Sequence, residues 1–232
     1  ILSRAKVDFV TRLSVGGAKI DQKGVTKILG CWIDEDAGKW STNTRELIKS
    51  AYSRISMLTK LKYTGVNTQD LLEIYSLFIR SRVEYMSVVW HSSLTAEEAK
   101  KIENIQKTCF KIILGDAYTD YKSSLEWTQY KELSARREAR CLSFARKCLQ
   151  TPLTQGLFPE NPESNMGVRR SERFKVNFAH TENYRKSSVP HCQRLLNKHN
   201  LMEEEMRRTR REEARARARE EGARHGEGEE GS

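Results

Sequence analysis

Apolar residues recur at helical spacing through most of the chain between residues 43 and 150. The first of these stripes consists of Leu47, Ala51, Tyr52, Ile55, Leu58 and Leu61. Steps of three and four residues place such side chains on one side of an α-helix, where they can pack against other helices. The pattern predicts a helix that begins near Asn43, is capped by Asn43 and Glu46, and ends at Gly65.

The next stretches of the chain carry the same period and their own boundary signals. Residues 69–90 are apolar on more than one face, which predicts the most buried helix of the fold, although Arg80 and Arg82 interrupt it and must reach water or an anion. Thr95 and Glu98 form a capping box for a third helix, which Gly115 ends. Further helices are expected over residues 121–127 and 130–150.

The N-terminal stretch has the features of short strands instead. β-Branched runs at Val7–Val10 and Gly24–Ile28 are separated by a Gly16-Gly17 turn. A last strand is expected at Lys27–Asp34, where the central Gly30 indicates a bulge or a close backbone approach. The predicted fold class is therefore mostly α, with a small N-terminal β-element followed by a helical bundle.

Composition divides the chain into four segments. A β-rich segment, 1–40, precedes a helical domain, 41–150, and prolines and glycines then mark an irregular extension, 151–200. Residues 201–232 are almost entirely Glu, Arg, Ala and Gly, which can form a solvated helix but offer no apolar stripe. We expect this tail to be an exposed helix that frays into disorder at Gly222.

The basic excess belongs to the part of the chain that can form a core. The chain has 41 Lys and Arg against 31 Asp and Glu, a net charge of +10. Residues 201–232 hold 8 Arg and 10 Glu, a net −2, which leaves +12 on residues 1–200. A basic surface favours an anionic partner, nucleic acid or anionic lipid, over a merely solvated face. No run of about 18 apolar residues is present, so the chain is not expected to span a membrane. The partner expected is nucleic acid and not a membrane.

Several of these cations lie on otherwise amphipathic helices, where they could follow a phosphate backbone. Arginine offers phosphate a planar bidentate fork, and lysine offers a point charge. A solvated face is the alternative for each helix taken singly, but together the helices favour a phosphate-binding surface. The candidate nucleic-acid-binding residues are Arg54, Lys60, Lys62, Arg136, Arg137, Arg140, Arg146 and Lys147.

The sequence predicts no catalytic residue and no metal site. His91 and Cys109 suggest a nucleophile and its base, but no signature of the G-x-S-x-G kind accompanies them. The run Asp34–Asp36 is more typical of a polar turn than of two-metal chemistry, which needs carboxylates from separate elements. Four other residues fit no closed zinc pattern: His180, His191, Cys192 and His199.

Cysteine usage indicates a reducing compartment. The five cysteines are widely spaced, form no C-x-x-C pair and follow no signal peptide, which favours buried thiols over disulfides. We therefore expect an intracellular protein, in the nucleus or the cytoplasm, and not a secreted one. The chain begins at Ile1 without an initiator Met, which predicts a fragment of something longer.

An ordered series of segments resembles a known family. The series comprises KILGCWID (27–34), IYSLFIRSRVEYMSVVWHSSLT (74–95), IENIQKTCFKIILG (102–115) and FKVNFAHTENYRKSSVPHCQRLLN (174–197). Their order resembles the region after the polymerase active site in reverse transcriptases, the RNA-directed DNA polymerases of non-LTR (LINE-type, jockey-like) retrotransposons. The resemblance covers about residues 1–200.

The resemblance implies a role for each part of the chain. Residues 1–40 would be a palm remnant with a primer-grip-like strand, in which Leu29, Gly30 and Cys31 lie near the primer terminus. Residues 41–150 would be the thumb, which with its extension holds an RNA/DNA template-primer by backbone contacts. Mg²⁺ would belong to the full-length polymerase only, so no cofactor is expected in this chain.

The chain also departs from the family pattern. The aromatic-x-Asp-Asp metal-binding motif is absent from the sequence, which predicts a chain that is inactive by itself and whose palm and fingers come from a longer polypeptide. Arg4-Ala5-Lys6-Val7 stands where the family has Lys-Thr-Lys-Val, and Asn43 stands in place of a His. The alternatives are a helical protein-interaction module and a transposon relic without function.

Overall fold

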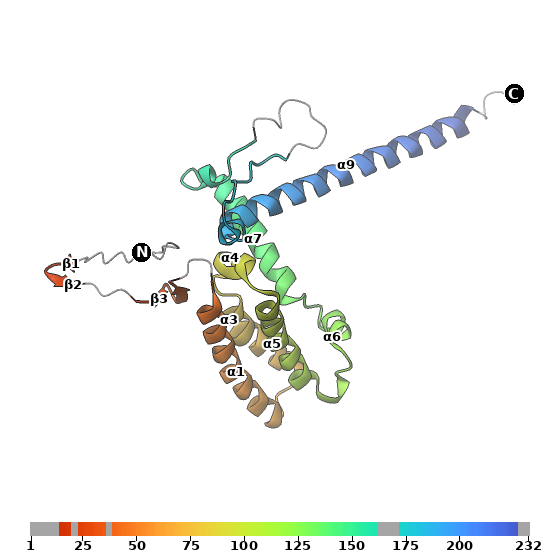
Figure 1. Ribbon diagram of the computed structural model, residues 1–232. Coiled ribbons are helices and arrows are strands. Elements are labelled where there is room, and N and C mark those ends of the chain that lie inside the picture. Colours follow the sequence, from red (N-terminus) through yellow and green to blue (C-terminus); the bar gives the residue numbers. More distant parts are fainter. Residues whose placement is uncertain (1–13, 20–22, 36–38, 162–171, 227–232) are drawn as a thin grey trace. The chain divides into compact units, whose positions relative to one another are not determined.

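A computed structural model describes residues 14–19, 23–35, 39–161 and 172–226, with side chains except at residue 19 and residues 215–226 (Figure 1). The described chain is mostly helical, as expected, and has two small antiparallel sheets of two strands each near its N-terminal end. It divides into two compact units. The first unit comprises Ile1–Phe144 and Asn177–His191, and the second comprises Ala145–Val176 and Cys192–Ser232.

Both small sheets are hairpins. Strands β1 (Ser14–Val15) and β2 (Ala18–Lys19) are joined by the expected Gly16-Gly17 turn, in which both glycines have positive φ. The expected strand at Val7–Val10 lies outside the described residues. The glycine pair suits this turn because glycine adopts positive φ without a steric penalty.

The second hairpin corrects one prediction. β3 (Val25–Ile28) pairs with β4 (Cys31–Asp34), so Lys27–Asp34 is not a single strand. Leu29 and Gly30 form its two-residue turn, with φ of 48° and 86°. Two positive φ values match the right-handed twist of the flanking strands, which explains the glycine better than a bulge does.

Hydrogen bonds to backbone donors connect this hairpin to the first helix. α1 (Ser41–Tyr63) begins two residues before Asn43, which is buried and is not the cap that the sequence predicted. The Oδ1 atom of Asn43 instead accepts a hydrogen bond from the Trp32 backbone N–H at 3.2 Å. Asp34 Oδ2 accepts from the Thr42 N–H at 3.2 Å, so a carboxylate from β4 satisfies a donor in the first turn of α1.

The first unit is built around two long helices that lie side by side, α1 and α5 (Ala96–Leu114) (Figure 1). The capping box of Thr95 and Glu98 is confirmed, and Gly115, with φ of 55°, follows the last turn of α5 as predicted. The apolar stripes of both helices are mostly buried as expected, although Tyr52, which the sequence placed on the stripe of α1, is 45% exposed. Their buried members are Leu47, Ala51, Ile55, Leu58, Ile102, Ile105, Cys109, Phe110 and Ile113.

Residues 69–90 do not form one continuous helix. The stretch comprises α2 (Thr68–Ile74), a π-helix η1 (Tyr75–Arg80), α3 (Ser81–Val83) and α4 (Ser87–Trp90). Met86, with φ of 49°, breaks the helical path before α4.

The π-helix keeps one face of this stretch in the core. Four fully buried side chains follow at steps of four residues: Leu71, Tyr75, Ile79 and Val83. In an α-helix of 3.6 residues per turn, such a series drifts around the axis. The wider turn of a π-helix, with its i→i+5 hydrogen bonds, counteracts this drift. The π-helix therefore keeps these four side chains in one buried stripe.

A carboxylate of α5 caps the start of α7 in the first unit. α6 (Tyr121–Thr128) and α7 (Leu133–Gln150) match the predicted helices, and the short α8 (Glu182–Arg185) lies later in the chain. Glu103 on α5 accepts hydrogen bonds from the Leu133 N–H at 2.9 Å and the Ser134 N–H at 3.1 Å. A side chain distant in sequence thus satisfies the free donors at the start of α7.

The second unit contains the end of α7 and most of α9 (Ser188–Gly226). Asn197 on α9 forms a pair of hydrogen bonds with the backbone of Phe174: its Oδ1 accepts from the N–H at 2.9 Å and its Nδ2 donates to the carbonyl at 2.8 Å. Because α9 begins at Ser188, the expectation of an irregular chain through residue 200 is wrong.

The charged tail forms the expected exposed helix. α9 does not end at Gly222, where the sequence predicted fraying, but continues to Gly226. Side chains from 201 to 214 are exposed except at residue 203. None of the described helices combines the length and the apolar character that a membrane crossing requires.

Candidate nucleic-acid interface

The predicted cations of α1 differ in their exposure and in their contacts. Lys60 is exposed, and Arg54 lies half-buried with its guanidinium carbon 6.0 Å from the centre of the Phe78 ring. Lys62 donates from Nζ to the Ile113 carbonyl at 2.9 Å, near the end of α5. A cation there satisfies a terminal carbonyl and interacts favourably with the helix dipole, so Lys62 has a structural role.

Two predicted cations of α7 share one buried carboxylate. Glu84, only 1% exposed, accepts from Nε and Nη2 of Arg136, the second contact at 3.2 Å. Nη2 of Arg140 lies 3.1 Å from Glu84 Oε2. The hydrogen bond from Arg136 to Glu84 raises the pKa of Arg136 further above its ordinary value. One carboxylate thus orients two guanidinium groups whose remaining surface is open to solvent.

Arg137 is not part of this exposed set, which corrects the prediction for that residue. Its side chain is fully buried, with Nε donating to His91 Nδ1 at 3.3 Å and the guanidinium carbon 6.0 Å from the Trp90 ring centre. Burial lowers the pKa of Arg137. A guanidinium without solvent access cannot contact a phosphate backbone.

The burial of Arg137 has a signal in the sequence. Arg137 occupies one stripe with Leu133 and Cys141, four residues before and after it, and both of these are fully buried. Arg136 and Arg140 lie off that stripe. Helical spacing therefore separates the three arginines, although their clustering in sequence suggests a common role.

The last two predicted cations belong to the second unit. Arg146 Nη2 lies 3.1 Å from His199 Nδ1 and 3.4 Å from Glu203 Oε1, so α9 supplies its partners. Lys147 is exposed. The first unit therefore contains the other predicted residues, and the second unit contains these two.

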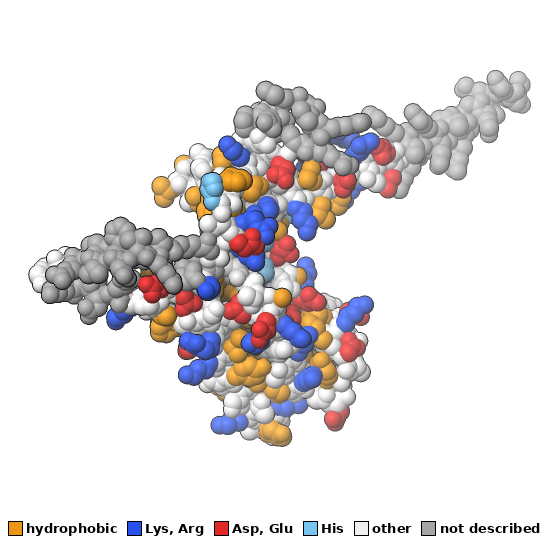
Figure 2. All heavy atoms as spheres, in the orientation of Figure 1, with side chains coloured by type: hydrophobic (Ala, Val, Ile, Leu, Met, Phe, Trp, Pro, Cys, Tyr) orange, Lys and Arg blue, Asp and Glu red, His pale blue; other side chains and the backbone are white. Residues whose placement is uncertain are grey.

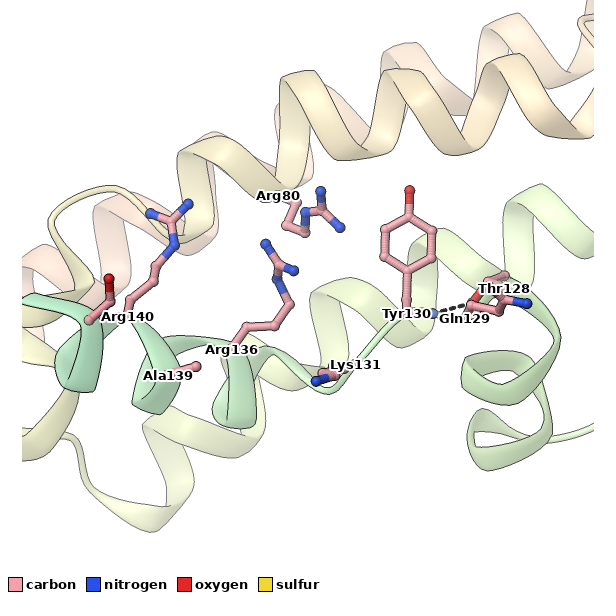
Figure 3. A pocket seen from close by; sticks show the side chains of 9 residues that line it. Arg80, Thr128, Gln129, Tyr130, Lys131, Arg136, Ala139 and Arg140 are labelled. Carbon is pink, nitrogen blue, oxygen red and sulfur yellow. Dashed lines mark hydrogen bonds between the residues drawn. The ribbon is translucent and has the colours of Figure 1, made fainter. Parts of the chain in front are cut away.

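An open pocket of about 620 Å³ lies beside Arg136 and Arg140 in the first unit (Figure 3). Two further cations line it, Arg80 from the π-helix and Lys131 from the loop before α7. The Arg80 guanidinium carbon stacks 4.8 Å from the centre of the Tyr130 ring. Neither Arg80 nor Lys131 is among the predicted binding residues, although the interruption of an apolar segment by Arg80 is a signal for it.

No protein-family model, curated protein or solved structure matches this chain. The pocket unites cations from three separate elements, the π-helix, the loop before α7 and α7 itself.

The primer-grip-like residues occupy the turn of the second hairpin. Leu29 is 78% exposed, and its carbonyl accepts a hydrogen bond from the Tyr85 hydroxyl at 2.8 Å. A Cβ atom on Gly30 would lie 3.2 Å from Tyr85 Cε1, which fits the expected close approach. Cys31 is buried, and its thiol donates to the Met86 sulfur at 3.5 Å. Only Leu29 of the three presents its side chain to solvent.

The environments of Cys109 and His91, the side chains considered for catalysis, do not favour a nucleophile or a base. Burial raises the pKa of the Cys109 thiol to about 12. Burial, Arg137 and His191 together lower the pKa of His91 to about 4. No hydrogen bond joins Cys109 to His91 in the described part of the chain. A buried thiol and an imidazole that accepts from arginine do not form a nucleophile and base pair.

The described residues contain no group of three His, Cys, Asp or Glu side chains that could hold a metal ion. Of the zinc candidates, His191 packs edge-on to the His91 ring at 5.8 Å, and His199 contacts Arg146 and Glu203. Asp34 accepts from the first turn of α1, and residue 36 lies outside the described chain. The described side chains therefore do not fit the Mg²⁺ of a polymerase.

Proposed function

We propose that this chain is the thumb and C-terminal extension of a non-LTR retrotransposon reverse transcriptase. It binds an RNA/DNA template-primer through the phosphate backbone and has no catalytic site of its own. The ordered sequence segments support the family, and the net charge of +12 on residues 1–200 supports the ligand. A longer polypeptide supplies the palm, the fingers and the Mg²⁺ site, in the nucleus or the cytoplasm.

The convergence of four cations on one open pocket is the observation that supports this function best. The lining includes Arg80, Lys131, Arg136 and Arg140 and no carboxylate among the described residues, and the buried Glu84 pairs with Arg136 and Arg140. On the visible face of the first unit, Lys and Arg side chains are interspersed with apolar and acidic ones (Figure 2). Such a surface suits a ligand with both phosphates and aromatic bases.

The salt dependence of affinity tests the proposal. Binding of a primer-template duplex by the full chain should weaken about 100-fold between roughly 50 and 200 mM salt if about four phosphates are contacted, because each contact releases counterions. Replacement of Arg136 and Arg140 by Gln, together with Glu84→Gln so that no buried carboxylate is left unpaired, should reduce both the affinity and the salt slope. An affinity that hardly changes with salt would contradict the phosphate contacts.

Exposed apolar side chains favour a second candidate, a protein-interaction module. Leu77 is 72% exposed and Phe78 is 56% exposed on the π-helix, and Tyr52 and Met57 are exposed on α1. Side chains of this size and exposure are typical of interaction surfaces when they form a contiguous patch. A protein partner that is retained equally after nuclease treatment would favour this candidate. Rapid aggregation of the purified chain, with neither ligand bound, would favour a relic without function.

A further inference from the structure

The pocket of Figure 3 has a local excess of positive charge. Its four cationic side chains, Arg80, Lys131, Arg136 and Arg140, and the one carboxylate that pairs with two of them leave a net charge of +3. Cations gathered at this density repel one another unless an anion lies among them. The charge of the pocket is therefore suited to a multiply charged anion.

Glu84 fixes the geometry of the donors on one side of the pocket. It holds Arg136 through Nε and Nη2, and Nη1 of Arg136 has no hydrogen-bond partner among the described residues. Arg140 is bound through Nη2 to the Glu84 carboxylate and through Nη1 to the Glu84 carbonyl at 3.5 Å. A carboxylate that is 1% exposed keeps both guanidinium groups in place before any ligand arrives.

The opposite side of the pocket is fixed by an aromatic ring. Tyr130 donates from its hydroxyl to the Leu72 carbonyl at 3.3 Å, which holds the ring under the Arg80 guanidinium. Nη2 of Arg80 donates to Ser76, one turn earlier. Within the described chain no carboxylate forms an ion pair with Arg80. Figure 3 shows Arg136 extending from α7 toward Arg80.

The pocket therefore offers donors from two sides to one small anion. A terminal phosphate monoester fits this arrangement better than an internal phosphodiester does. The monoester carries about −1.5 to −2 charges at neutral pH and three terminal oxygens, whereas a diester carries one charge and two such oxygens. Arginine forks bind these oxygens in pairs.

We propose that this pocket binds the terminal phosphate of a nucleic-acid strand in preference to an internal phosphate. The inference rests on the proposed nucleic-acid binding and adds a preference for a phosphorylated end. Other internal phosphates would be held by exposed cations elsewhere, such as Lys60. The preference for the end would come from Arg80, Arg136 and Arg140.

The experiment compares two single-stranded oligonucleotides of one sequence, with a 5′-phosphate or a 5′-hydroxyl, titrated into the full chain at fixed salt and pH 7.5. The phosphorylated strand should bind about tenfold more tightly, the value of one charge-assisted hydrogen bond. Arg80→Gln should remove most of this difference. Arg185→Gln should keep it, because Arg185 pairs with Glu182 on α8 and lies outside the pocket.

A second variant, Lys131→Gln, tests the inference even if Arg80→Gln does not fold. Lys131 is exposed and its side chain forms no hydrogen bond within the described chain, so Lys131→Gln should fold normally and reduce the preference in part. Additional arms use the nucleoside 5′-monophosphate and a phosphoserine peptide. Either of these binding as tightly as the phosphorylated strand would overturn the assignment to a strand end.

The outcomes separate this inference from the proposed function. Equal affinity for the 5′-phosphate and 5′-hydroxyl strands would overturn the inference and leave nucleic-acid binding in place. A tenfold preference for the phosphorylated strand that persists in both Arg80→Gln and Lys131→Gln would show that the strand end binds at another site. That result would also overturn the inference. No binding of either strand, or of a duplex, would contradict the proposed function itself.

Discussion

Arg137 donates a hydrogen bond from Nε to Nδ1 of His91 at 3.3 Å, and this guanidinium is completely buried. The bond requires His91 to be neutral, because a protonated imidazole has no free lone pair at Nδ1. The terminal nitrogens Nη1 and Nη2 of Arg137 have no hydrogen-bond partner within the described structure. The pair therefore places a positive charge and a second titratable group together inside the first unit.

The stability of the chain should decrease as the pH falls from about 6.5 to about 4. The pKa of His91 is about 4 in the folded chain, mainly because of burial, with contributions from Arg137 and His191. In this window the unfolded chain binds a proton that the folded chain does not bind, so unfolding is favoured by up to about 3 kcal/mol. Urea unfolding at several pH values measures the effect. His91→Gln should flatten the curve in this window, and an unchanged slope would contradict the assignment.

Arg137→Met should leave the chain as stable as the wild type or stabilise it by about 1 kcal/mol. Methionine fills a similar volume and removes a buried charge whose terminal donors are unsatisfied. Arg136→Met is the matched control and should destabilise by about 2 kcal/mol, because Glu84 then keeps only Arg140. Arg137→Met should also leave the affinity for primer-template unchanged. A loss of affinity in a chain of normal stability would show that Arg137 reaches the ligand.

Glu103→Gln should destabilise the first unit by about 1 to 2 kcal/mol. The carboxylate accepts from two backbone donors at the start of α7 and from the Tyr121 hydroxyl, and an amide offers only one acceptor oxygen. Glu97→Gln on the same helix provides the comparison, since Glu97 forms an exposed ion pair with Lys101. Thermal unfolding of the two variants should differ clearly. Equal unfolding temperatures would mean that α7 does not depend on this cap.

Leu29→Asn should stabilise the second hairpin by about 0.5 to 1 kcal/mol. Leu29 is held at φ of 48°, where asparagine is favoured and leucine is strained, and Asn-Gly is the preferred pair for such a turn. Leu29 is mostly exposed, so little packing is lost. Gly30→Ala is the opposing control and should destabilise, because its Cβ would approach Tyr85. A loss of primer-template affinity in Leu29→Asn would indicate that the strained leucine serves binding.

The sequence predicted those features of the fold that depend on residues close together in the chain. The capping box at Thr95, the glycine stop at Gly115 and the stripes of α1 and α5 involve residues within a few positions of one another. The hairpin turn at Leu29 did not follow from the sequence, because leucine is rarely placed at positive φ. Nor did the start of α1, since its stabilising carboxylate, Asp34, belongs to the preceding strand.

The candidate site depends on contacts between distant residues, and the sequence indicates only part of it. Arg136 and Arg140 are predicted from their charge, but their partner Glu84 lies 52 and 56 residues earlier in the chain. No pattern in one sequence relates them. The sequence marks Arg80 only as a cation that needs water or an anion, and its position over Tyr130 is a product of the tertiary fold.

The π-helix between Tyr75 and Arg80 makes the pocket depend on helix geometry as well as on residue type. If these six residues formed an ordinary α-helix, the C-terminal part of the stretch would rotate by roughly 100° relative to the N-terminal part, because each α-helical residue turns further about the axis than a π-helical residue does. Either the stripe that contains Ile79 would leave the core or Arg80 would leave Tyr130. Every side chain of the pocket could then be retained and the pocket still be lost.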